Sequence, residues 1–342
     1  MGKDKSQLTT MAYCFNFKWF LQMTVGMRLF SKTTKTAGWL SINIEEDGIY
    51  MAHVTPIPAA LSQVGLIAFY PADKTQVQPT LEKLAKELHT DRYECTNLLN
   101  PGEYQLLSVD TPNVPQDELK TAIRWRLKDM LDFHIDDATI DVLDIPGDKN
   151  APERKGAMYA VAAHSPFIKQ RQTLFEQLKI SLSVIDIPEM AQRNISALLE
   201  PQDRGLALLS FDNTGGLLTV TFAGELYLSR RFDVTLEQLR QTDIDQKNAC
   251  YDRVTLELQR SFDHFERQFR FIAVAKLMLA PLGEGSAGLQ EYLAANLYMP
   301  VETFNLDAVL DISKVPELEQ ASQQQRYFMA LGAALRQEVK VL

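Results

Sequence analysis

Cysteine is scarce in this sequence and forms no pattern. The 342 residues include three cysteines, Cys14, Cys95 and Cys250. Their number is odd, they lie far apart, and none belongs to a Cys-x-x-Cys pair or to a Cys/His ligand spacing. The sequence therefore gives no support to a disulfide framework or a structural zinc site, and we expect isolated thiols in a reducing compartment.

Histidine is almost as rare, and the familiar catalytic motifs are missing. The five histidines are scattered, and none lies four residues from another, so no helical zinc site is indicated. The sequence contains no Gly-x-Ser-x-Gly, no His-Glu-x-x-His and no Gly-x-Gly-x-x-Gly after a strand. The segment FDNTGG at 211–216 is not a Walker loop, because no lysine follows its glycines at the required spacing. We expect no metal site.

Long apolar runs are also missing. The most apolar stretch, 11–30, is interrupted by Asn16, Lys18 and Gln22 and has no small-residue cleavage site, so it makes a poor membrane span and a poor signal peptide. We expect residues 1–37 to form a leader outside the folded part. Three readings of it stay open: translation that begins at Met27, a flexible tail, or a tail that touches lipid through its basic residues.

Positive charge is in deficit. There are 35 Lys and Arg residues against 44 Asp and Glu residues, which gives a formal net charge of −9 and a pI near 5.2. The summed field of such a protein repels phosphate backbones. Nucleic acid is therefore not an expected partner, while 46% hydrophobic and 23% charged residues are typical of a globular chain.

The pattern that is present repeats itself. Alternating or apolar β-forming segments at 38–44, 48–54 and 64–71 are joined by short turns, which predicts an antiparallel meander. A second set follows at 206–213, 216–224 and 225–234. Each set leads into alternating helices and strands, including a long helix expected over about 254–269. Two such halves predict an internal duplication and a two-lobed α/β protein.

A helix is expected inside the first half, over 114–133. Pro115 can open it, and its apolar face comprises Leu119, Ile123, Trp125, Leu127, Met130 and Leu131. Trp125 lies between two arginines and could stack on a partner, but we expect it to be a half-buried residue of this face.

Two stretches carry a resemblance to a known family. These are GEYQLLSVDTPNVPQDELKTAIRWRLKDMLDFHIDDATIDVLDIP at 102–146 and KISLSVIDIPEMAQRNI at 179–195. Together with the duplicated plan, they resemble the PilM-like branch of the actin, Hsp70 and FtsA-like ATPase superfamily, whose members serve type IV pilus machines. The resemblance covers about 38–336. It implies an actin-like, duplicated ribonuclease H-like fold in two lobes, 38–200 and 201–342, with a small α/β subdomain inserted at about 97–165.

The resemblance also locates the positions where such enzymes bind nucleotide. The family's aspartate and glycine of the first hairpin fall on Asn43 and Glu45, and those of the second on Ser210 and Asp212. Glutamates beside a polyphosphate repel it by a few kcal/mol at the dielectric constant of a cleft. We therefore expect a pseudo-ATPase without a cofactor.

The adenosine-side loop departs from the family in the same way. It reads PLGEGSAGL at 281–289, where a proline and a leucine replace the glycine pair, although Gly283 and Gly285 could compensate in part. The alternative is an ATPase switch that binds ATP and Mg²⁺ through contacts moved to NTGG (213–216) and to this loop.

The resemblance implies the partner as well. PilM-like proteins hold the extended cytoplasmic tail of a PilN-like inner-membrane protein, so we expect a non-enzymatic scaffold on the cytoplasmic side of the inner membrane, in an MSHA-type pilus machine. We expect the groove for the tail near the helix that contains Glu118, Trp125 and Leu131, because the resemblance is most specific there. Contacts with other subunits of the machine are also expected, and dimerisation is left open.

Overall fold

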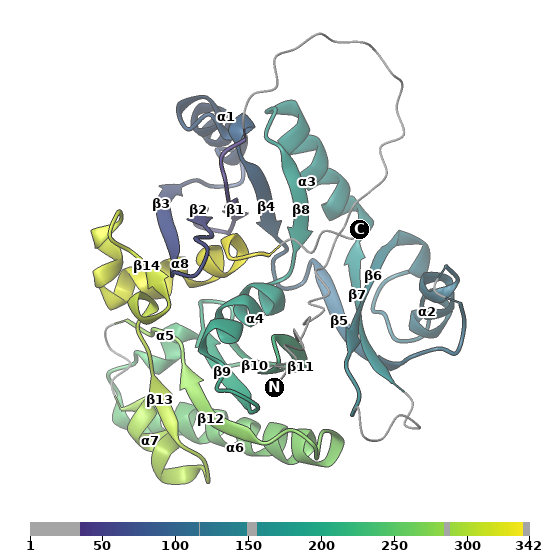
Figure 1. Cartoon of the computed structure of the whole chain (residues 1–342), viewed down its shortest axis with the longest axis vertical. Helices are drawn as coiled ribbons and strands as arrows, with labels where there is room; N and C mark the ends of the chain where they lie inside the picture. The colour runs from purple at the N-terminus through teal and green to yellow at the C-terminus, as the bar shows by residue number, and fades with distance from the viewer. Residues whose placement is uncertain (1–34, 116, 149–155, 284–287, 338–342) are drawn as a thin grey trace, which may run out of the picture.

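The computed structural model describes residues 35–115, 117–148, 156–283 and 288–337. Within them the chain forms two lobes, each built on a mixed sheet, and a smaller third sheet at one side (Figure 1). The expected leader lies outside the described residues, except for its last three. Cys95 and Cys250 are buried free thiols, and Cys14 lies outside the described part.

The first lobe contains a six-stranded sheet in the order β14-β3-β2-β1-β4-β8. Strands β1, β2 and β3 are antiparallel, whereas β4 and β8 run parallel to β1. The strands and the helices that accompany them are β1 (Trp39–Ile44), β2 (Gly48–Thr55), β3 (Ser62–Pro71), α1 (Val77–Glu87), η1 (Thr90–Arg92), β4 (Glu94–Leu98), α3 (Ser165–Gln177), β8 (Leu182–Asp186) and β14 (Leu310–Asp311). Apolar residues of β1 and β2 form a buried core with α1 and α3.

The second lobe repeats this plan. Its sheet has the order β11-β10-β9-β12-β13, so an antiparallel meander is again followed by parallel strands. Its elements are β9 (Gly205–Phe211), β10 (Gly216–Phe222), β11 (Glu225–Phe232), α5 (Leu236–Leu239), α6 (Ile244–Gln268), β12 (Val274–Leu279), α7 (Leu289–Asn296) and β13 (Val301–Thr303). The repeated strand order agrees with the predicted duplication.

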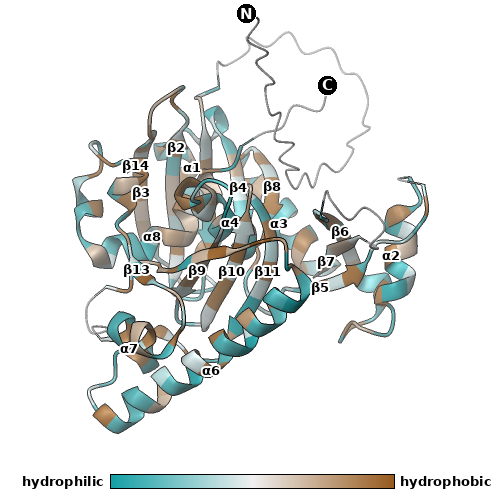
Figure 2. Ribbon diagram, turned by 60° about the horizontal axis from the view of Figure 1, so that its bottom comes forward, coloured by the Kyte–Doolittle hydropathy of each residue, from teal (hydrophilic) through white to brown (hydrophobic). Residues whose placement is uncertain are grey.

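Helix α6 is longer than the sequence pattern indicated. It begins at Ile244, ten residues before the expected start, because the Asp243 side chain caps it by accepting a hydrogen bond from the amide of Gln246. Figure 2 shows α6 as largely hydrophilic on the side turned to the viewer, while its buried apolar residues share one core with the strands of the second lobe. This distribution is typical of an amphipathic helix on a sheet.

The third sheet lies between β4 and β8 in sequence. It has the order β5-β7-β6, from β5 (Tyr104–Asp110), η2 (Ile135–Asp137), β6 (Ala138–Ile145) and β7 (Ala157–His164), and α2 (Leu119–Leu127) covers one face. We call these elements, 104–164, the inserted subdomain. Helix α2 starts at Leu119 and not at Pro115, since Asp117 and Glu118 lie in a turn and the Glu118 amide donates to the Pro115 carbonyl.

The expected apolar face of α2 is only partly right. Leu119, Ile123 and Leu127 are buried, but the Trp125 side chain is 72% exposed and Met130 is 47% exposed. The expectation of a half-buried Trp125 was therefore wrong. A helix that covers a small sheet buries only a narrow stripe, and Trp125 lies outside it.

Two helices join the lobes. Helix α4 (Pro188–Leu199) and helix α8 (Ala321–Ala334), which follows η3 (Leu306–Ala308) and η4 (Pro316–Glu319), pack on each other between the sheets. Gly332 permits this contact, because a Cβ atom there would lie 2.3 Å from the Ala191 carbonyl oxygen. Residues of β2, β9, β12 and α8 share one core across the lobes. No helix in the described ranges combines the length and the hydropathy of a membrane span.

Candidate functional site

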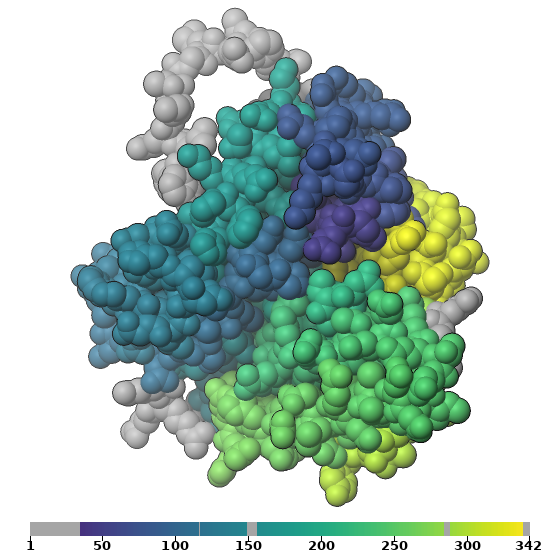
Figure 3. Space-filling view, turned by 180° about the vertical axis from the view of Figure 1, so that it is seen from behind, coloured from purple at the N-terminus to yellow at the C-terminus, as the bar shows by residue number. Residues whose placement is uncertain are grey.

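The two expected hairpins face each other between the lobes. The turn after β1 carries Glu45, and the turn after β9 carries Asp212. The pKa of Glu45 is raised from 4.5 to about 7, first because of burial and then because of the negative charges of Asp212 and Asp47. The Glu45 side chain nevertheless keeps contact with solvent. Figure 3 shows the purple residues of the first hairpin beside the green surface of the second lobe.

The first hairpin uses the Asn43 oxygen and the Glu45 amide internally, while the buried Asn43 Nδ2 has no hydrogen-bond partner among the described residues. The Asn43 side chain is buried, and its Oδ1 accepts from the Ser41 hydroxyl and from the Leu98 amide, both at 3.1 Å. The backbone amide of Glu45 donates to the Gly48 carbonyl at 2.8 Å. Asn43 therefore links β1 to β4, and the amide at the family's glycine position closes the turn instead of pointing at a ligand.

The second hairpin does the same with different residues. The buried Ser210 hydroxyl donates to Oε1 of Gln192 on α4 at 2.5 Å. The amide nitrogen of Gln192 donates in turn to the carbonyls of Leu208 and Leu217 and to the Thr219 hydroxyl. Ser210 thus belongs to an uncharged network that fastens α4 to the sheet.

Polar groups of the NTGG segment also have hydrogen-bond partners within the turn. One carboxylate oxygen of Asp212 accepts hydrogen bonds from the Thr214 amide at 2.7 Å, the Thr214 hydroxyl at 2.6 Å and the Gly215 amide at 3.0 Å. The Asp212 amide itself donates to the Gly215 carbonyl at 2.9 Å. The ATPase alternative would use the amides of this segment to bind phosphate. Those of Thr214 and Gly215 already donate to the Asp212 carboxylate of their own turn.

The third expected nucleotide segment is described in part. Gly283 has a φ of +66°, and a Cβ atom added there would lie 2.8 Å from Nη2 of Arg240, which also donates to the Leu282 carbonyl at 2.8 Å. The Arg240 side chain packs against the loop at this point. Gly285 lies outside the described residues.

These residues do not fit ATP with Mg²⁺. The metal-holding aspartate positions carry the uncharged Asn43 and Ser210, whose oxygens have protein partners. The glycine positions carry the carboxyl groups of Glu45 and Asp212, which repel a triphosphate whenever they are ionised and fill the space of the glycines in either state. In the part of the chain that the structure describes, no group of three His, Cys, Asp or Glu side chains could hold a metal ion.

The expected partner-binding residues have different environments. Trp125 and Glu118 are exposed and lie seven residues apart on one face of α2 and its cap. Leu131 is half buried and packs under α2. The arginines that flank Trp125 hold the helix in place: Arg124 contacts the Ala138 carbonyl and Asp136, and Arg126 donates to the Asp110 carbonyl at 2.8 Å. Their contacts leave the indole ring facing solvent.

Sequence reasoning missed a polar cluster where the inserted subdomain meets the second lobe. Glu189, at the start of α4 and 1% exposed, accepts from Arg231 of β11 at 3.0 Å and from the Tyr104 hydroxyl of β5 at 2.5 Å. Arg231 also donates to the Tyr104 oxygen at 2.7 Å. Burial disfavours the charged guanidinium, but the attraction of Glu189 outweighs it and raises the pKa of Arg231. These residues are 85 and 42 positions apart, so no local pattern could have joined them.

Comparison with known proteins identifies the fold. No family model and no curated protein sequence matches this chain. Among solved structures, the PilM-PilN type IV pilus biogenesis complex is similar with a TM-score of 0.66 and 18% identity, over 88% of this chain and 98% of that one.

Two further solved structures are similar at lower scores. The cytoplasmic domain of EpsL, from the type II secretion system of Vibrio cholerae, has a TM-score of 0.41 and 15% identity over 60% of this chain and 74% of that one. MreB 5 of Spiroplasma citri bound to AMPPNP has a TM-score of 0.40 and 6% identity over 84% and 96%. The fold is the two-lobed actin-like α/β fold, as expected.

Proposed function

We propose that this protein is a non-enzymatic scaffold of a type IV pilus machine, which docks the cytoplasmic tail of a PilN-like inner-membrane partner. The observation that carries the proposal is the match with the PilM-PilN complex, which extends over 98% of that chain. The described residues contain no helix suited to span a membrane, so a membrane-anchored partner would supply the attachment. The protein would then act on the cytoplasmic face of the inner membrane.

The finer assignment is to an MSHA-type pilus, with this chain in the role of MshI. It rests on the resemblance of the stretch 102–146, which forms β5, α2 and β6 of the inserted subdomain. Other subunits of the machine would assemble around the same scaffold.

A pseudo-ATPase is the second part of the proposal. The internal partners of Asn43 and Ser210 and the charges of Glu45 and Asp212 support it. Titration of fluorescent ATP with Mg²⁺ into the full chain should give no saturable signal up to about 100 μM. The carboxylates of the two turns repel the triphosphate, and the turn amides already have hydrogen-bond acceptors. Saturable, Mg²⁺-dependent binding in the micromolar range would instead support the nucleotide-switch alternative.

The docking surface is proposed at α2, around Trp125. A large aromatic side chain with 72% exposure is a typical hot spot for an extended peptide. Trp125→Ala should weaken binding of the partner's cytoplasmic tail peptide by about tenfold or more in calorimetric titration.

Tyr298→Ala is the matched control, since Tyr298 is fully exposed on the second lobe, away from α2. Equal affinity of the wild type and the Trp125 variant would place the groove elsewhere. Failure of the wild type to bind the tail would contradict the proposed partner itself.

A further inference from the structure

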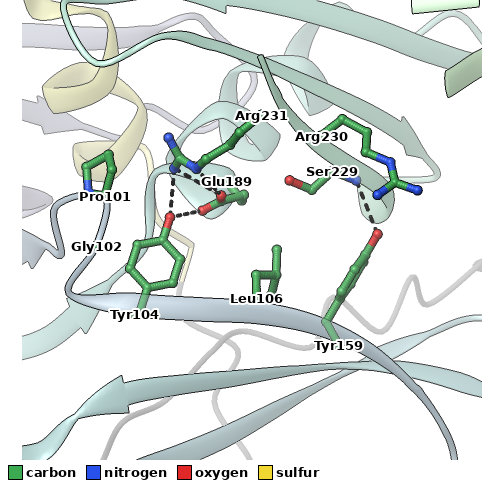
Figure 4. A pocket seen from close by; sticks show the side chains of 9 residues that line it. All are labelled: Pro101, Gly102, Tyr104, Leu106, Tyr159, Glu189, Ser229, Arg230 and Arg231. Atoms are coloured by element: carbon green, nitrogen blue, oxygen red, sulfur yellow. Dashed lines mark hydrogen bonds and ion pairs between the residues drawn. The ribbon is translucent and has the colours of Figure 1, made fainter. Parts of the chain in front are cut away.

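A cavity lies between the inserted subdomain and the second lobe. Its volume is about 320 Å³, and Figure 4 shows its polar lining. The residues that matter here are Tyr104 and Tyr159 of the subdomain, Glu189 of α4, and Ser229, Arg230 and Arg231 of β11. This volume is at the lower end of the range for ligand pockets and suffices for a few side chains or a short peptide segment.

The carboxylate on the floor of the cavity, that of Glu189, already has hydrogen-bond partners. Both oxygens of Glu189 accept hydrogen bonds, one from Arg231 and the other from the Tyr104 hydroxyl. The Tyr104 oxygen accepts in addition from Arg231. The floor therefore leaves no carboxylate oxygen free for a cationic or donor ligand.

One wall of the cavity is a sheet edge. Strand β11 is the last strand of its sheet and pairs on one side with β10. On its other side the Tyr159 hydroxyl accepts from the Ser229 amide at 3.1 Å and lies 3.1 Å from the Tyr227 carbonyl oxygen, to which it donates. One residue of a parallel strand makes this same pair of bonds, to residues two apart on its neighbour. The hydroxyl therefore substitutes for a single residue of an added strand.

The next pair of edge groups has no such substitute. The amide and carbonyl of one strand residue point to the same side, so the Ser229 carbonyl and the Arg231 amide face outward beside the Ser229 amide. Within the described residues no hydrogen bond occupies either group. Ser229 and Arg231 both line the cavity together with Tyr159 (Figure 4).

The charge at this edge favours an acidic ligand. Arg230 is exposed at the cavity, and its guanidinium makes no hydrogen bond or ion pair with any described residue. Nη1 of Arg231 is equally without a hydrogen bond in the described part. Among the residues that line the cavity, Glu189 is the only acid beside two arginines, and the charge of Asp212 also acts on Arg231, so Arg230 is the cation left for a ligand.

We propose that this cavity binds an extended acidic segment of another protein, which adds one residue to the edge of β11 and places a carboxylate against Arg230. Main-chain bonds to an exposed edge with a pocket for one side chain are a known mode of peptide recognition. The chain's own residues 1–34 are a poor occupant, because their lysines and arginine outnumber their single acidic residue, Asp4. This site stands apart from the docking surface around Trp125.

A peptide library tests the proposal. Nine-residue peptides displayed on phage are selected on the immobilised full chain, and the enriched sequences are synthesised and titrated in solution. We expect Asp or Glu at one fixed position and affinity about tenfold lower for Arg230→Glu. Arg270→Glu, the same charge change at another exposed arginine of this lobe, should leave affinity unchanged.

A second arm tests the main-chain pairing. In each selected peptide, every amide is methylated in turn, and we expect one position, at or next to the acidic residue, to lose at least tenfold in affinity, because its N–H bonds the Ser229 carbonyl. Enrichment without an acidic position, equal binding to the Arg230 variant, or indifference to methylation would each overturn the proposal. Tail binding that depends on Trp125 and not on Arg230 leaves the proposed function intact, so the two can fail separately.

Discussion

At the scale of single residues, the side-chain oxygens of Asn43 and Ser210 bind the protein itself. Asn43 accepts a hydrogen bond from an amide at the end of β4, and Ser210 donates one to a glutamine of α4. A buried amide or hydroxyl that lost such a partner would cost about 1–3 kcal/mol, so both positions have a structural reason to keep their present residues. Glu45 is the exception, because its carboxyl group lies near Asp212 of the second lobe and Asp47 of its own turn.

Glu45 makes stability depend on pH. Its pKa is raised to about 7 in the folded state by burial, Asp212 and Asp47, against 4.5 as the reference value. The folded protein therefore holds a proton that the unfolded chain releases, so the contribution of this group is fully present below pH 4.5 and is lost as pH rises through 7. Between pH 5 and 8 the melting temperature of Glu45→Gln should fall less than that of the wild type.

Glu46→Gln serves as the control, since it removes one carboxylate from the same turn. Parallel melting curves for the wild type and Glu45→Gln across this pH range would show that the facing carboxylates do not interact.

At the scale of elements, the contact of α4 with α8 depends on one glycine. Asn194 of α4 also donates to the Gly332 carbonyl at 2.9 Å, so the helices are both close and bonded. Gly332→Ala would gain about 1 kcal/mol of helix propensity. A Cβ atom 2.3 Å from the Ala191 carbonyl must push backbone apart, however. We expect net destabilisation of about 1–3 kcal/mol in urea unfolding.

Gly147→Ala is the control for this substitution. A Cβ atom at position 147 meets nothing within 4 Å, so this variant should have nearly the same free energy of unfolding as the wild type. A Gly332 variant as stable as the wild type would mean that the two helices can separate without cost.

At the scale of the whole molecule, the end of the described chain returns to the first lobe. Arg336 pairs with Asp186 at the end of β8 at 2.5 Å, and the two side chains are 4% and 3% exposed. Arg336→Gln removes the hydrogen-bonded cation of the buried Asp186 and leaves it only the Ile187 amide and the charge of Arg193, so this change should lower the free energy of unfolding by about 3 kcal/mol. Asp186→Asn with Arg336→Gln should cost less than the sum of the two single changes in urea unfolding. Additive losses would show that the pair is not coupled.

Much of the architecture followed from local pattern. The two meanders, the helices after them and the duplication were predicted, because alternation and the 3.6-residue period reflect which face each element buries. Errors came where tertiary contacts or caps decide. The start of α6 depends on the cap at Asp243, and the exposure of Trp125 depends on how narrow a stripe the small subdomain covers.

The sequence by itself determined the order and type of the elements, the acidic balance, and the residue types on the two hairpins, because these depend on neighbouring side chains and simple sums of charge. Only the tertiary structure decided that the side-chain oxygens of Asn43, Ser210 and Asp212 take part in internal hydrogen bonds, and that Tyr104, Glu189 and Arg231 meet. Hydrogen bonds between distant residues form only after the lobes and the subdomain pack. For this reason the edge of β11 and its cavity could not be found from the sequence.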